Sequence, residues 1–231
     1  MKFNLLFPSR CPICDSLLDK GSMICKECAI IPRIVPAPRC MKCGKHIESA
    51  DEMYCFDCKK FPKNFVSGAA LYEYDSVHDS INDMKNGGRP EYATFYGNMM
   101  AERLGPLIKS FKPDALVPIP LHETKMRKRG YNQAQLLADV ISERLSIPVR
   151  NDLLERTVKT KEQKKMTDLQ RQNNLVGAFH IRQNDVKLYN VVLVDDVYTT
   201  GSTLNEAAKT LREGGVQNVY FVTLAIGRGY S

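Results

Sequence analysis

The sequence predicts an α/β protein, with a parallel sheet covered by helices on both faces and a small cysteine-rich module in front of it. Beyond residue 68, short apolar runs alternate with stretches of helical spacing, and unbroken apolar strands are typical of parallel sheets buried on both faces. All eight cysteines lie within the first 58 of the 231 residues. We therefore expect two domains, at residues 1–62 and 63–231.

The cysteine-rich module contains four C-x-x-C pairs. Two thiolates at this spacing can bind one tetrahedral metal ion, and eight thiolates complete two four-sulfur sites. A reducing compartment favours two structural zinc ions over disulfides. Joining consecutive pairs would form a double zinc ribbon, while a cross-braced arrangement, with the first pair joined to the third, stays open. The expected zinc ligands are Cys11, Cys14, Cys25, Cys28, Cys40, Cys43, Cys55 and Cys58.

The elements of the main domain follow from hydrophobic periodicity. Apolar runs predict strands at residues 68–74, 114–120, 191–194 and 219–226. Apolar positions at i, i+3, i+4 and i+7 predict helices over about residues 92–109, 132–145 and 204–211. The last helix should end at Gly214 and Gly215, and the proline-rich spacer at residues 30–39 should be extended.

The formal net charge of +7 is unevenly distributed along the chain. Residues 1–62 hold ten basic and seven acidic side chains, and two zinc ions with eight thiolates would bring their charge to about −1. Residues 122–171 hold twelve basic and seven acidic side chains. Such a patch suits a polyanion, either a nucleic acid or a pyrophosphate ligand, and charge alone does not decide between them.

Residues 191–203, VVLVDDVYTTGST, put two carboxylates and a hydroxyl-rich turn next to each other. Asp195 and Asp196 follow the apolar strand, at the sheet edge where parallel α/β sheets bind ligands. Residues 199–203 begin the next helix, where free N–H groups and the helix dipole favour an anion. A phosphorylated sugar suits both groups, with its hydroxyls on the carboxylates and its phosphate on the turn. Neither a P-loop nor the dinucleotide-binding glycine motif occurs in the sequence.

This stretch resembles the phosphoribosyl pyrophosphate (PRPP) motif of type I phosphoribosyltransferases, and the resemblance implies their fold. In that family the two acids contact the ribose hydroxyls and the following loop holds the 5′-phosphate. Magnesium is implied as the ion that binds with PRPP. The implied PRPP-binding residues of the motif are Asp195, Asp196, Val197, Tyr198, Thr199, Thr200, Gly201, Ser202 and Thr203.

The four cysteine pairs and two further stretches, VPIPLHETKMRKRGYNQA and ERTVKTKEQKKMTDLQRQNNLVGAF, are similar to the ComF family of competence proteins. The resemblance implies that the basic stretch after residue 120, expected to be a long loop, holds pyrophosphate. Arginine suits this ligand because its planar fork can bind two oxygens at once. Lys125, Arg127 and Arg129 are the candidates there.

Residues 156–179 fit the second ComF-like pattern and are expected to form a mobile flap that closes over the ligand. Arg156 and Gln163 are its candidate PRPP-binding residues. Val158 departs from the family pattern, and so does Asn86 in MKNGGR. Lys85 and Arg89, on either side of Asn86, are secondary candidates.

The ComF resemblance implies PRPP binding in DNA uptake during natural competence, with single-stranded DNA and the competence DNA translocase as partners. The alternative is an active, magnesium-dependent phosphoribosyltransferase with an unidentified nitrogen acceptor. Asp195, Asp196, Arg127 and Arg129 would then be catalytic, through positioning and stabilisation of the leaving pyrophosphate. A homodimer is left open. The sequence has no signal peptide and no membrane-spanning run, which predicts a cytoplasmic location.

Overall fold

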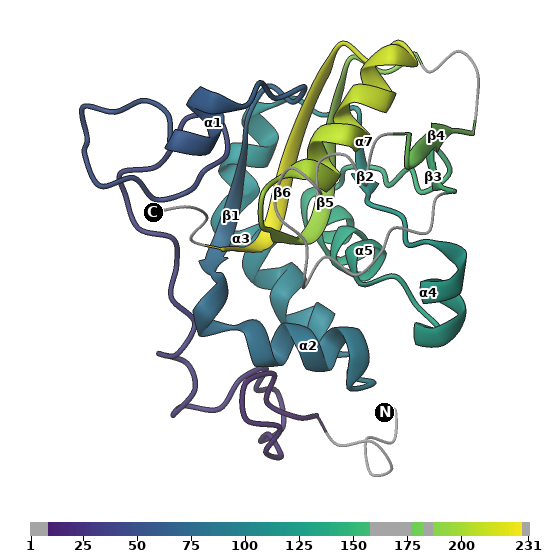
Figure 1. The fold of residues 1–231 in the computed structure, drawn as a ribbon. Coiled ribbons are helices and arrows are strands. Elements are labelled where there is room, and N and C mark those ends of the chain that lie inside the picture. Colours follow the sequence, from purple (N-terminus) through teal and green to yellow (C-terminus); the bar gives the residue numbers. More distant parts are fainter. Residues whose placement is uncertain (1–8, 158–176, 183–186, 228–231) are drawn as a thin grey trace.

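The structure is a computed structural model that describes residues 9–157, 177–182 and 187–227. Its centre is a parallel sheet in which, among the described residues, four strands lie in the order β1-β6-β5-β2 (Figure 1). Their side chains are nearly all buried, as continuous apolar strands require, so the predicted parallel sheet is confirmed. The strands are β1 (Gly68–Glu73), β2 (Ala115–Pro118), β5 (Asn190–Tyr198) and β6 (Asn218–Ile226).

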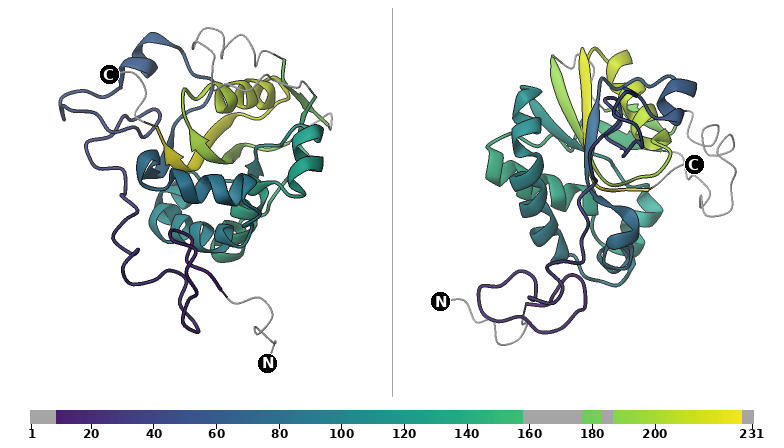
Figure 2. Two further views of the ribbon diagram at one scale, coloured as in Figure 1. Left: turned by 60° about the horizontal axis from the view of Figure 1, so that its bottom comes forward. Right: turned by 90° about the vertical axis from the view of Figure 1, so that its left-hand side faces the viewer.

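Helices cover both faces of this sheet (Figure 2). The helices α2 (His78–Asn86), α3 (Tyr92–Ser110) and α5 (Gln133–Leu145) share one hydrophobic cluster with Val192 and Val194 of β5. On the opposite face, α7 (Ser202–Glu213) buries its predicted apolar stripe against Val191 and Leu193. Helix α5 begins where expected because the Asn132 side chain accepts a hydrogen bond from the Ala134 N–H, at 3.1 Å.

Two boundaries differ from the predictions. Strand β5 continues beyond the expected end at Val194 as far as Tyr198, because β6 pairs with it up to Ile226 and buries both aspartates. The basic stretch expected as a loop contains the helix α4 (Glu123–Arg129), capped at its start by His122 and ended by Gly130 at φ 83°. Helix α2 was not predicted, and a short 3₁₀ turn (Tyr74–Ser76) precedes it.

The two ends of the expected flap meet in a small antiparallel sheet. Strand β3 (Leu154–Arg156) pairs with β4 (Phe179–Ile181), and Arg156 lies opposite Phe179. The stretch between them, including Gln163, lies outside the described residues at positions 158–176. The prediction of a flap therefore stays a prediction.

The cysteine-rich module reaches both ends of strand β1. The spacer between the ribbons runs antiparallel along the free edge of β1, where Val35 N–H donates to Leu71 O at 3.0 Å and Glu73 N–H donates to Arg33 O at 2.8 Å. The spacer is extended around Ile34, which forms an antiparallel bridge with Tyr72, and it bends at residues 31–32 and 37–38. The first ribbon consequently lies near α2, and the second, with the short helix α1 (Phe56–Lys60), lies near the start of β1 (Figure 1). Across the described part of the chain, no helix is both long and apolar enough to span a bilayer.

Candidate ligand and metal sites

Asp195 and Asp196 form a buried carboxylate pair near the carboxyl end of β5. Their side chains belong to residues that are only 9% and 5% exposed. Asp195 Oδ1 accepts a hydrogen bond from the Asp196 N–H at 2.9 Å, and Lys85 Nζ lies 2.6 Å from Asp196 Oδ2. The lysine comes from the last turn of α2, so two elements far apart in sequence meet at the aspartates.

The buried setting changes the protonation of this pair. Burial and, next, the charge of Asp196 raise the pKa of Asp195 to about 8. Lys85 and Arg156 act in the opposite direction because their positive charges favour the ionised carboxylate. Asp195 therefore lies beside the Lys85–Asp196 ion pair, and its raised pKa favours the protonated carboxyl group near neutral pH.

The turn after β5 has the backbone geometry of an anion site. Gly201 is the N-cap of α7 with φ 75°, and it offers no side chain to the N–H groups of the first helical turn. The hydroxyls of Thr200 and Ser202 are hydrogen-bonded to each other at 2.7 Å, and the Ser202 N–H donates to Thr200 Oγ1 at 3.4 Å. A Cβ at position 201 would lie 2.3 Å from the Tyr198 hydroxyl oxygen, so only glycine fits this turn.

The three basic candidates of the α4 region have different surroundings. Lys125 and Arg127 are exposed on α4, and Arg127 pairs with Glu123 one turn earlier. Arg129 is half-buried, and its guanidinium donates to Gln133 Oε1 and, at 3.5 Å, to Asn86 Oδ1. Burial lowers the pKa of Arg129, while the charges of Asp196 and Asp195 oppose that shift, so this arginine lies in the field of the carboxylate pair.

Arg156 approaches the carboxylates from the small β3–β4 sheet. Its guanidinium carbon lies 5.5 Å from the centre of the Phe179 ring, a cation–π contact across the strand pair. Burial lowers the pKa of Arg156, and the charge of Asp195 opposes the change. The structure thus brings Arg129 and Arg156 towards the same pair of acids.

The contact between Lys85 and Asp196 is one that the sequence does not predict. Lys85 belongs to the MKNGGR stretch, at the end of a helix, α2, that was not predicted. Without this helix, the sequence gives no reason to expect Lys85 beside Asp196. Tyr131 Oη fixes this helix end by donating to Met84 O at 2.6 Å. Arg89, the other secondary candidate, instead reaches the first ribbon, where its Nη2 lies 2.6 Å from Asp15 Oδ2.

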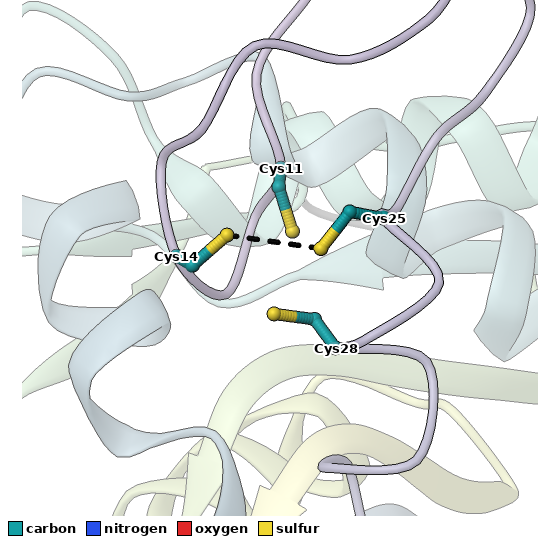
Figure 3. A group of neighbouring side chains, drawn as sticks. All are labelled: Cys11, Cys14, Cys25 and Cys28. Atoms are coloured by element: carbon teal, nitrogen blue, oxygen red, sulfur yellow. Dashed lines mark hydrogen bonds between the residues drawn. The ribbon is translucent and has the colours of Figure 1, made fainter.

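The eight cysteines form two separate four-sulfur groups. In each group the sulfurs lie within 4.8 Å of one another, and each group joins two consecutive C-x-x-C pairs. Figure 3 shows the sulfurs of the first group, Cys11, Cys14, Cys25 and Cys28, pointing towards a common centre. The second group is Cys40, Cys43, Cys55 and Cys58. The cross-braced alternative is therefore wrong.

The sulfur spacing fits zinc. Cys14 Sγ lies 3.8 Å from Cys25 Sγ, and Cys43 Sγ lies 3.6 Å from Cys55 Sγ. A tetrahedral ion with bonds of about 2.3 Å to sulfur has neighbouring sulfurs roughly 3.8 Å apart. The two groups differ in exposure: the first has two buried cysteines and the exposed Cys14, whereas the second has three buried cysteines and none that is exposed.

Comparisons with known proteins agree with both parts of the structure. A double zinc ribbon family matches residues 3–59, and the phosphoribosyl transferase domain family matches residues 108–230. The chain therefore has a phosphoribosyltransferase domain that follows a double zinc ribbon. The ribbon contains two zinc sites of four cysteines each.

Curated relatives of this chain narrow that class. Competence protein F of Haemophilus influenzae is 42% identical over 223 residues, covering 81% of this chain and 96% of that protein. Competence protein ComFC of Bacillus subtilis is 28% identical, covering 89% of each chain. DNA utilization protein YhgH of Escherichia coli K12 is 28% identical, covering 93% of this chain and 96% of that protein. The chain belongs to the ComF family, as the sequence motifs predicted.

Proposed function

We propose that this protein binds PRPP at the end of β5 and acts in the cytoplasm in the handling of DNA during natural competence. The observation that carries the ligand assignment is the buried Asp195–Asp196 pair directly before the glycine-capped start of α7. The ribose diol would bind the two carboxyl groups, and the 5′-phosphate would accept hydrogen bonds from the turn at residues 199–203.

Basic side chains near the acids supply the remaining charge complementarity. Arg129 and Arg156 lie in the field of the aspartates, and Lys125 and Arg127 line the exposed face of the neighbouring α4. These groups would bind the pyrophosphate of PRPP, with Gln163 as a further candidate. Magnesium, when bound with PRPP, would neutralise part of the pyrophosphate charge.

Calorimetry with PRPP and magnesium tests the ligand assignment. We expect wild type to bind and Asp195→Ala/Asp196→Ala to lose binding while keeping two zinc ions per chain. Asp139→Ala, an exposed acid on α5, is the matched control and should bind as wild type does. Wild-type affinity in the double variant would refute the assignment.

The proposed role in DNA handling is supported by the names of the relatives, which are competence proteins and a DNA utilization protein. Single-stranded DNA and the competence DNA translocase are the proposed partners. Binding of single-stranded DNA should weaken steeply as salt rises, because bound phosphates release counterions. Binding that is absent at low salt, or insensitive to salt, would rule out direct DNA contact. A pull-down with the translocase tests the second partner.

An active phosphoribosyltransferase is the second candidate, favoured by the half-buried Arg129 near the acids. A nitrogen atom of the acceptor would form the bond to C1′ as the bond from C1′ to the pyrophosphate oxygen breaks, and pyrophosphate would leave with that electron pair. Arg129 and Arg127 would stabilise the leaving charge. Pyrophosphate release in the presence of common nucleobases would support turnover, whereas PRPP binding without release would favour the binding role.

A further inference from the structure

The second zinc site shares its hydrophobic core with the turn proposed to hold phosphate. Cys40, Cys43 and Cys55 belong to the same buried cluster as Tyr198 at the end of β5 and Leu204 in the first turn of α7. In the part of the chain that the structure describes, the cysteines of the first site belong to neither of the two large clusters. The two zinc sites therefore differ in whether their ligands join the core of the main domain.

Tyr198 lies between the second zinc site and the turn. Its ring is 1% exposed and stacks on Phe221, with centroids 5.2 Å apart. Phe221 in turn meets the edge of Phe65, which follows the second ribbon, at 4.8 Å. The hydroxyl lies directly under the backbone of Gly201, so the ring supports the turn from below.

The buried Tyr198 side chain belongs to the same cluster as Cys40, Cys43 and Cys55 of the second ribbon. Within the described residues, the hydroxyl oxygen has no hydrogen-bond partner. Its position is thus set by packing between the ribbon, Phe221 and the turn, and not by a bond of its own.

The segment leaving the second zinc site is bonded to both sides of the same turn. Lys63 Nζ donates to Thr200 O at 3.5 Å, on one side of Gly201. Asn64 N–H donates to Asn205 Oδ1 at 2.6 Å, in the first turn of α7. These contacts begin five residues after Cys58, the last zinc ligand, so the ribbon fixes where this segment meets the turn.

The ribbon itself is held tightly against strand β1. Gly68 N–H donates to Lys42 O at 3.0 Å, and a Cβ at Gly44 would lie 2.8 Å from Ala69 Cα. Lys45 Nζ and Asp57 Oδ2 form a buried ion pair inside the ribbon at 2.6 Å. Loss of the metal would therefore loosen the ribbon side of the buried cluster in which Tyr198 is packed.

We propose that the second zinc site is a structural part of the phosphate-binding turn, with Tyr198 as the positioning residue that connects them, and that the first zinc site has no such role. This role of the second zinc site depends on the proposed function in one respect only, that the turn binds phosphate. Zinc at the second site would order residues 199–205; zinc at the first site would order only the first ribbon and its contacts with α2 and α3.

Hydrogen exchange of the ligand-free protein tests this coupling. The probe is the Asn205 amide, which donates to Gly201 O at 2.8 Å and reports on the turn. Cys43→Ser/Cys58→Ser should retain one zinc ion and exchange this amide about tenfold faster than wild type. Cys14→Ser/Cys25→Ser, the matched control, should also retain one zinc ion but exchange it at the wild-type rate. Equal rates in both variants, fast or slow, would overturn the proposal.

Variants of Tyr198 test the same coupling between the second zinc site and the turn if the second-site variant does not fold. Tyr198→Leu should keep both zinc ions, speed exchange at Asn205 and weaken ribose 5-phosphate binding at least tenfold. Tyr198→Phe keeps the ring and should restore both properties to near wild type. Wild-type exchange in Tyr198→Leu would overturn the proposal. Failure of wild type to bind ribose 5-phosphate would refute the proposed function alone, because the exchange measurement needs no ligand.

Discussion

Lys85 Nζ lies 2.6 Å from Asp196 Oδ2, and this contact joins the end of α2 to the carboxyl end of β5. The lysine side chain is 25% exposed and the aspartate side chain 6% exposed, so the pair is only partly solvated. Its chief consequence is local: it places one positive charge beside two buried carboxyl groups.

Lys85→Met should destabilise the protein and raise the pKa of Asp195 still further. Removal of one partner of a well-buried pair costs about 3–5 kcal/mol, and the partial exposure of Lys85 reduces this to roughly 1–3 kcal/mol. Urea unfolding measures the loss, and carboxyl NMR titration measures the pKa. Lys128→Met, on the exposed face of α4, should change neither. An unchanged Asp195 pKa in Lys85→Met would contradict the assigned contact.

The raised pKa of Asp195 predicts a pH dependence of stability. Its ordinary value is 3.8 and its folded value about 8, so between these values the folded state binds more protons than the unfolded state. The free energy of unfolding contributed by this residue should therefore fall as pH rises from about 4 to 8. Urea unfolding between pH 5 and 8 measures the slope. Asp195→Asn should be less sensitive to pH, and a slope equal to that of wild type would disprove the prediction.

Arg129 should matter more for a pyrophosphate ligand than Arg127. The guanidinium of Arg129 is half-buried near the aspartates, whereas Arg127 is exposed and paired with Glu123. A hydrogen bond to a charged group is worth about 1.5–3 kcal/mol, so Arg129→Gln should weaken binding of magnesium pyrophosphate roughly 10- to 100-fold. Arg127→Gln is the matched comparison, with a smaller loss expected. The reverse order in calorimetry would show that the α4 face carries the binding.

Gly201→Ala should destabilise the turn for a reason specific to this position. The backbone is at φ 75°, and the new Cβ would lie 2.3 Å from the Tyr198 hydroxyl. Gly88 has φ 71° and nothing within 4 Å, so Gly88→Ala carries the conformational strain without the clash. Strain alone costs about 1–3 kcal/mol, and Gly201→Ala should lose more than Gly88→Ala in thermal unfolding. Equal losses would mean that Tyr198 does not pack under the turn.

Sequence reasoning predicted the parts of the fold that have a regular repeat. The apolar stripe from Leu204 to Leu211 and the unbroken run from Val191 to Val194 specify how each element packs, whatever surrounds it. The cysteine spacing likewise allowed two four-sulfur sites, although only the structure chose between consecutive and cross-braced pairing. Regular patterns therefore predicted which elements exist and which faces they bury.

The contacts that define the candidate site were not predictable in the same way. Strand β5 extends through Asp195 and Asp196 because β6 and basic side chains from other elements compensate their burial, and no local pattern encodes those partners. Helix α4 has one apolar residue, Met126, and therefore no apolar stripe, so periodicity gave no signal for it. Lys85 and Asp196 are 111 positions apart in the sequence, and only the tertiary fold brings them into contact.

Chelation should remove the two zinc ions in separate steps. The first site has two buried ligands, but Cys14 is exposed and Cys25 partly so. The second site has three buried ligands, and these belong to the core cluster that contains Tyr198. A chelator should thus take the first ion quickly with little change in the unfolding temperature of the main domain. Release of the second ion requires the core around Tyr198 to open, so it should be slower and should lower that unfolding temperature by several degrees.

A metal-indicator assay followed alongside circular dichroism resolves the two steps, and Cys14→Ser/Cys25→Ser should show the slow step alone. Simultaneous release of both ions would mean that the sites open together, despite their different burial.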